Sequence, residues 1–165
     1  MAMLCRVVTG IAGGVLGAGA MAALQIPLRG WLRRKGTPGA LADSGIGFQA
    51  AFRLPEPTAV TAQRLLWRST FGLEHPLASA LMVHAGFGAS AGLFYACFVP
   101  RGIALALGFG VVLWLGATEG VLPRLKLTKT ARRSSVEIQA FGLGEHLLYA
   151  CLLHQVRRSY CQTGR

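Results

Sequence analysis

Charged residues are scarce in this chain, and acidic residues are the scarcest. Asp, Glu, Lys and Arg together make up 14% of the 165 residues, whereas apolar residues make up 53%. Ordinary soluble domains carry about 25% charged residues. This deficit argues against a surface solvated by water on all sides and favours a protein surrounded by lipid. At this length we expect a single domain, residues 1–165.

Only six acidic residues stand against 17 Lys and Arg, which gives a net charge of +11. A nucleic-acid-binding protein would spread its basic residues over one surface or along one helix. Here they fall in the gaps between apolar runs, as is typical of residues held at a membrane–water boundary. We therefore expect the basic residues to meet anionic lipid head groups, and we expect no nucleic-acid partner.

Motifs of metal binding and catalysis are missing from the sequence. The four cysteines, Cys5, Cys97, Cys151 and Cys161, have no CxxC or other metal-ligand spacing, and we assign them neither a disulfide nor a metal. The chain also contains no HExxH motif, no phosphate-binding loop and no recognisable Ser–His–Asp set. We expect no catalytic residues, no cofactor and no enzymatic activity.

Four apolar runs dominate what is present. At a rise of about 1.5 Å per residue, each is long enough to cross the hydrocarbon layer of a bilayer. The predicted spans are residues 7–28, 76–99, 102–122 and 136–156. The start of the first run also resembles a signal peptide, with an A-x-A site at 18–20, but its apolar character continues to Leu28.

The connections complete the predicted architecture. The sequence Pro100-Arg101-Gly102 predicts a tight turn that makes an antiparallel hairpin of the second and third spans. The long loop 29–75 contains a predicted helix at about 57–71, which lies in the membrane interface or packs on the bundle as an ordinary loop helix. The predicted fold class is therefore an all-α membrane protein, a four-transmembrane-helix bundle with one interfacial loop helix.

The distribution of basic residues predicts the orientation. Four spans place loops 29–75 and 123–135 on one face, with twelve Lys and Arg. They place the two ends of the chain and the turn at Arg101 on the other face, with five. The positive-inside rule then makes the long loop cytoplasmic, in the inner (plasma) membrane of a bacterium. The pair Arg157-Arg158 opposes this orientation.

Small residues recur at helical spacing in every run. Such stripes allow helices to approach closely in lipid, where apolar burial no longer drives association. We expect helix contacts at six glycines: Gly13, Gly17, Gly88, Gly92, Gly116 and Gly120.

Ionisable residues within the runs are the candidate site. The fourth span is the weakest because it holds Glu137, Glu145, His146 and His154, so it inserts only with its polar side turned inward. The predicted intramembrane polar cluster consists of His84, Glu119, Glu145 and His146. A His–Glu pair within the membrane can relay protons, hold a metal or bind the polar group of a ligand. The favoured interpretation is that it locks two helices together by a hydrogen bond.

Several short segments resemble a known group of proteins. They are "PTAVTAQRLLW" (57–67), "HAGFGASAGLFYA" (84–96), "EGVLPRLKL" (119–127) and "GEHLLYA" (144–150). In this order they resemble the YagU-like family of small uncharacterised bacterial inner-membrane proteins. The resemblance implies that His84 and His146 match family histidines and that Glu119 matches an acidic residue before a proline. Ala150 departs from the pattern, which usually has glycine there.

The resemblance implies a four-helix inner-membrane protein and no particular reaction. From the residues, we expect an accessory or scaffold subunit of a larger membrane complex, with partner subunits or further copies of itself as neighbours. The alternative is a transporter or proton-linked membrane protein that uses the His/Glu cluster. A membrane enzyme would have only the same cluster to rely on.

Overall fold

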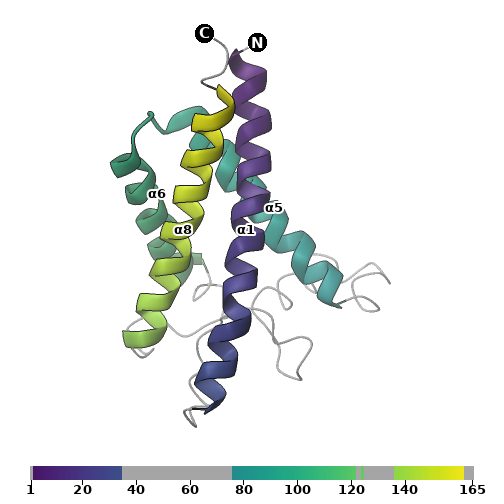
Figure 1. Cartoon of the computed structure of the whole chain (residues 1–165), viewed down its shortest axis with the longest axis vertical. Coiled ribbons are helices and arrows are strands. Elements are labelled where there is room, and N and C mark those ends of the chain that lie inside the picture. The colour runs from purple at the N-terminus through teal and green to yellow at the C-terminus, as the bar shows by residue number, and fades with distance from the viewer. Residues whose placement is uncertain (1, 35–75, 122–123, 125–135, 162–165) are drawn as a thin grey trace. The chain divides into compact units, whose positions relative to one another are not determined.

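The computed structural model describes residues 2–34, 76–121, 124 and 136–161, and these residues are helical almost throughout. Its elements are α1 (Ala2–Arg34), α5 (Pro76–Phe98), α6 (Ile103–Leu115), the π-helical segment η2 (Gly116–Val121) and α8 (Val136–Cys161) (Figure 1). Within those ranges there is no strand, so the predicted all-helical class is confirmed. The predicted loop helix at 57–71 lies outside the described residues.

Two of these helices are long and apolar enough to cross a membrane, at Met3–Leu24 and Leu81–Phe98. A third apolar helix, Ile103–Leu115, is shorter. The predicted third span is divided, because α6 ends at Leu115 and the chain continues as η2. Helix α1 contains Pro27 and does not end at Leu28, the predicted end of its span. It continues for six more residues, to Arg34.

The chain forms two compact units, which are described separately. Unit 1 comprises Met1–Met21, Ala85–Trp114 and Leu143–Arg165, and unit 2 comprises Ala22–His84 and Leu115–Gly142. Each of the four α-helices contributes a segment to unit 1. Most of the contacts that follow lie in this unit.

Helix α1 in unit 1 has one face of small residues and one of large apolar residues. The buried face repeats every three or four residues, the period of an α-helix. It consists of Thr9, Gly10, Gly13, Gly14, Gly17, Ala18 and Met21. The exposed large apolar residues of the same segment are Met3, Leu4, Val8, Ile11, Val15 and Leu16. The large apolar side chains of this segment therefore point away from its contacts with the other helices.

The buried face of α1 contacts α5 backbone to backbone. A Cβ added to Gly10 would lie 2.8 Å from the carbonyl oxygen of Gly92, and one added to Gly88 would lie 2.7 Å from that of Gly14. Gly14 and Gly92 face carbonyl oxygens of the partner helix in the same way. Each helix thus presents glycine Cα atoms to the carbonyl groups of the other, at a separation that leaves no room for a side chain.

The tight turn between α5 and α6 produces the predicted hairpin in unit 1. The N–H of Ala106 donates to the carbonyl oxygen of Gly102 at 3.0 Å, which begins α6 directly after the turn. Rings pack across the hairpin, with centroids 5.3 Å apart for Tyr95 and Phe109 and 6.3 Å apart for Phe94 and Phe109.

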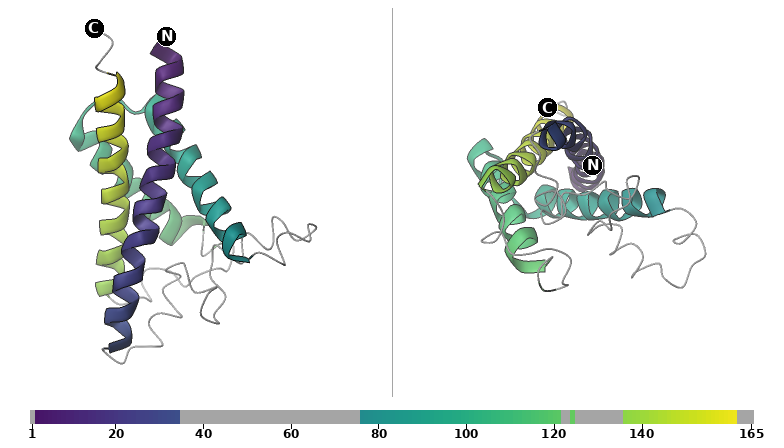
Figure 2. Two further views of the ribbon diagram at one scale, coloured as in Figure 1. Left: turned by 45° about the vertical axis from the view of Figure 1, so that its right-hand side comes forward. Right: turned by 90° about the horizontal axis from the view of Figure 1, so that it is seen from below.

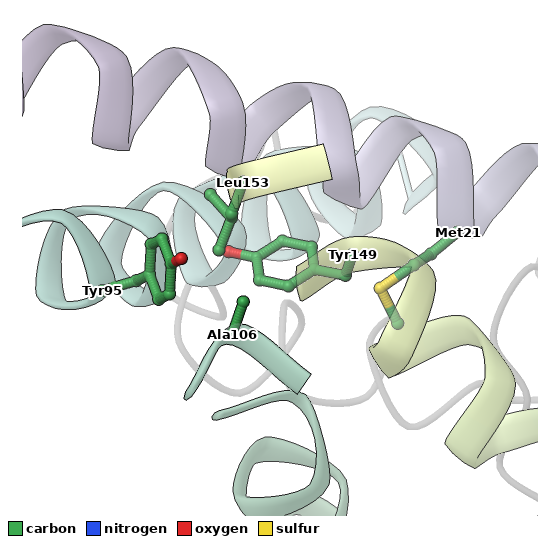
Figure 3. Packing of buried hydrophobic residues seen from close by; sticks show 5 residues of the cluster. All are labelled: Met21, Tyr95, Ala106, Tyr149 and Leu153. Atoms are coloured by element: carbon green, nitrogen blue, oxygen red, sulfur yellow. The ribbon is translucent and has the colours of Figure 1, made fainter. Parts of the chain in front are cut away.

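Five buried side chains drawn from all four helices form the core of unit 1. They are Met21 of α1, Tyr95 of α5, Ala106 of α6, and Tyr149 and Leu153 of α8 (Figure 3). Two of the five are tyrosines, and a buried tyrosine hydroxyl requires a hydrogen-bond partner. The partners of these hydroxyls define the polar site described next.

Candidate functional site

Arg157 is the centre of a polar cluster in unit 1, where α5 ends. Its side chain is only 6% exposed. Nη1 donates to the carbonyl oxygen of Val99 at 2.6 Å and lies 3.4 Å from that of Tyr95. Because the last carbonyl groups of a helix have no partner within the helix, Arg157 of α8 serves as the cap of α5.

Tyr95 and His154 complete this cluster, which we call the Arg157 cluster. The Tyr95 hydroxyl lies 3.2 Å from Nδ1 of His154, and the guanidinium carbon of Arg157 lies 5.5 Å from the centre of the Tyr95 ring. A cation at this distance over an aromatic face is attracted by the ring. The arrangement joins α5 to α8 through the guanidinium of Arg157 and the hydrogen bond between Tyr95 and His154.

The electrostatics of Arg157, one residue beyond the predicted fourth span, are set by burial. Burial lowers the pKa of Arg157 from its ordinary value, an effect that Tyr95 opposes and that the positive charges of Arg101 and Arg6 reinforce. An arginine pKa has a wide margin above neutrality, so the group stays charged. The cluster therefore holds a permanent positive charge.

A second polar contact lies deeper in unit 1. The Tyr149 hydroxyl of α8 donates to the carbonyl oxygen of Gly88 on α5 at 2.5 Å, and the side chain is buried. Its ring also contacts Gly17 of α1, where an added Cβ would lie 2.5 Å from Cδ2. Tyr149 therefore touches two helices at once, with its ring against one and its hydroxyl on the other.

We predict that Tyr149→Phe lowers the stability of the protein. The substitution leaves the buried Gly88 carbonyl without this donor, and a neutral hydrogen bond of this kind contributes about 1 kcal/mol. Thermal unfolding in detergent should show a lower midpoint than the wild type. The matched control is Tyr160→Phe, because Tyr160 is 71% exposed. Equal midpoints for both variants would contradict the assigned role of the hydroxyl.

The residues of the predicted intramembrane cluster fall in both units. His84 of α5 belongs to unit 2 and is half-buried, and Glu119 lies in η2 in the same unit. Glu145 and His146 of α8 belong to unit 1, where Glu145 is buried and His146 is half-buried. A polar cluster that contains both His84 and His146 would join residues of different units, and it stays a prediction.

The predicted packing glycines differ in what surrounds them. Gly13 faces Leu153 and Val156 of α8, and Gly17 faces Tyr149. Gly88 and Gly92 face α1, as described above. A Cβ added to Gly116 or to Gly120 would meet no heavy atom within 4 Å, so the described residues show no close contact at these two glycines.

The cysteines differ from the expectation that none forms a disulfide. Cys97 and Cys151 are free, but Cys5 near the start of α1 is disulfide-bonded. The expectation rested on sequence spacing, which carries no information about helix ends brought together by the fold. Within the described ranges, no group of three or more His, Cys, Asp or Glu side chains is placed to hold a metal ion.

The sequence interpretation did not identify the Arg157 cluster. It counted Arg157 as one of a pair of basic residues that oppose the predicted orientation, and it left His154 out of the predicted polar cluster. One signal was available: Arg157 lies four and eight residues after Leu153 and Tyr149, on the same face of α8. An arginine that continues an apolar helical face past the end of a span is a candidate cap for a neighbouring helix.

Comparison with protein-family models, with curated proteins and with solved structures finds no match to this chain. The assignment of function therefore depends on the residues and contacts above.

Proposed function

We propose that this chain is a small multi-pass protein of the bacterial inner membrane that serves as an accessory or scaffold subunit of a larger membrane complex. In this proposal the four spans of one bundle lie within α1, α5, α6 with η2, and α8, and the long loop 29–75 is cytoplasmic. The YagU-like resemblance of the quoted segments belongs to the same proposal.

One observation carries the membrane assignment, namely the division of α1 into a small buried face and a large apolar exposed face. In water, burial of large apolar side chains drives folding, so they are expected inside. In lipid the tails are as apolar as leucine, and close packing through small residues drives association instead. Gly13, Gly14 and Gly17 inside, with Val15 and Leu16 outside, match the second situation.

The degree of burial argues in the same direction. Apolar helices at the core of a soluble protein are mostly buried, but only 39% of the apolar window in Met3–Leu24 and 22% of that in Leu81–Phe98 are buried. The first helix also packs through Gly13 and Gly17 on α8, which supports its retention as a structural element rather than its removal as a signal peptide.

The role of a scaffold is supported by the use of the buried polar side chains. Arg157 caps α5, the Tyr95 hydroxyl meets His154, and the Tyr149 hydroxyl meets Gly88. Each of these contacts joins α5 to α8. Polar groups that serve to join helices favour a protein whose function is its shape and its contacts with neighbours.

We predict that the protein stays with the membrane after washing with alkaline carbonate and requires detergent for release. After gentle extraction, native mass spectrometry should show it in a stable complex with a different membrane protein. Release by carbonate would contradict the membrane assignment. A carbonate-resistant protein found only by itself would contradict the subunit assignment and leave the membrane assignment intact.

The alternative function, a transporter or proton-linked protein, is favoured by one observation, the burial of Glu145 in α8. Carboxyl groups at membrane depth are costly and are common in proton and ion pathways. In this case the extracted protein should be a homo-oligomer, because four spans are few for a carrier. The wild type should then carry protons into liposomes, and Glu145→Gln should not. A scaffold should show no proton flux in either form.

A further inference from the structure

Helices α1 and α8 pack antiparallel in unit 1 with a regular register. Gly17 faces Tyr149, and four residues closer to the start of α1, Gly13 faces Leu153, which lies four residues closer to the end of α8. Continued by four residues on each helix, this register leads to positions 9 and 157, where Thr9 and Arg157 are each 6% exposed. Figure 1 and the left view of Figure 2 show the first turns of α1 beside the last turns of α8.

One further step of the register leads to positions 5 and 161, and both are cysteines. Cys161 is the last residue of α8. The Sγ atom of Cys5 lies 3.7 Å from the carbonyl oxygen of Tyr160, the residue before it. Of the four cysteines, Cys5 is disulfide-bonded, and Cys97 and Cys151 are free. The register and the count of cysteines both indicate Cys161 as the disulfide partner of Cys5.

We propose that Cys5 and Cys161 form a disulfide that fastens the start of α1 to the end of α8, and that it lies on the non-cytoplasmic face of the membrane. The second part rests on the membrane assignment proposed above. Nearly all of the sequence lies between the two cysteines, and closing a long loop is the case in which a cross-link most restricts the unfolded chain.

The location follows from redox chemistry. Disulfides form and persist in the bacterial periplasm, whereas thiol reductants keep cytoplasmic cysteines reduced. Two thiols become one S–S bond by releasing two protons and two electrons, and the electrons pass by thiol–disulfide exchange to the disulfide of a periplasmic dithiol oxidase. The disulfide therefore places both ends of the chain outside, the orientation that the twelve-to-five count of basic residues predicts independently.

Thiol counting on the intact protein tests this proposal. Cells are quenched in acid, free thiols are blocked with N-ethylmaleimide in SDS, and disulfides are then reduced and labelled with a polyethylene-glycol maleimide. The wild type should gain two labels, and C5S and C161S should gain none, because the remaining thiol is blocked in the first step. The matched controls C97S and C151S should still gain two. Because labelling is done on denatured protein, the result holds even for a variant that folds poorly.

Three results would overturn the proposal: no label on the wild type, loss of label in a control variant, or a dimer that reduction dissolves. In cells that lack the periplasmic dithiol oxidase, the labelled fraction should fall severalfold, and an undiminished fraction would overturn the assigned location. Carbonate washing of the same membranes separates the two proposals. Release of the protein by carbonate contradicts the proposed membrane assignment. Retention in the membrane without any label contradicts only the proposed disulfide.

Discussion

Replacing Gly92 by alanine should destabilise the protein, although the change adds one methyl group. That methyl would lie 2.8 Å from Cα of Gly14 and 3.0 Å from its nitrogen, and closer still to the carbonyl oxygen of Gly10. All three atoms are backbone, so no side chain can rotate to make room. Overpacking of this kind costs about 1–3 kcal/mol. For a chain of this size each kcal/mol corresponds to about 2–4 °C, so the midpoint of thermal unfolding in detergent should fall by several degrees.

Gly86 provides the matched control on the same helix. A Cβ there would meet no heavy atom within 4 Å, and the residue is exposed. Since alanine favours helix more than glycine does, Gly86→Ala should leave the midpoint unchanged or raise it slightly. Of the two variants, only Gly92→Ala is therefore expected to lower the midpoint. A raised midpoint for Gly92→Ala would show that α1 and α5 are not in backbone contact.

Replacing Arg157 by alanine should have a comparable or larger effect. The substitution removes the donor to the Val99 carbonyl and leaves the end of α5 without its cap. Hydrogen bonds to charged groups contribute about 1.5–3 kcal/mol, and the apolar stem of a buried arginine adds packing that is also lost. We expect a clear fall in the detergent unfolding midpoint and less protein accumulated in the membrane.

Arg158 is the matched control, because it adjoins Arg157, carries the same charge and is exposed. Arg158→Ala should leave the unfolding midpoint within a degree or two of the wild type. Arg157→Lys should recover only part of the loss, since an ammonium is a point charge without the planar fork of a guanidinium. If Arg157→Ala and Arg158→Ala behaved alike, Arg157 would act only as one more basic residue near the end of α8.

The positions of the helices could be predicted from the sequence because long apolar runs bounded by charges and prolines leave few alternatives. The starts of α5 and α8 at Pro76 and Val136 agree with the predicted starts. The change to η2 at Gly116 was not predicted, since an insertion of one residue per turn leaves no mark on composition or hydropathy. The extension of α1 to Arg34 was also not predicted, because a polar helical end outside the apolar run has no hydropathy signal.

The site was harder to predict, for a physical reason. The position of each ionisable residue along its apolar run can be counted in the sequence. This count identified the ionisable residues near the middle of the runs as candidates. Contacts between helices depend instead on rotation and register, and these emerge only when the backbones are packed. Tyr95 and Tyr149 looked like ordinary apolar-run residues, yet their hydroxyls meet His154 and the Gly88 carbonyl. Likewise, no sequence spacing between the cysteines near the two ends of the chain indicated a disulfide.

The backbone contact between α1 and α5 also has a consequence for how this sequence changes over generations. Every residue other than glycine carries a Cβ, so at Gly10, Gly14, Gly88 and Gly92 each inherited replacement inserts an atom between two main chains. Outward-facing aliphatic residues, by contrast, exchange among themselves without touching that contact. Descendants of this chain should therefore vary on the bulky face of α1 and stay fixed on the small one, the inverse of the pattern left by selection on a core packed in water.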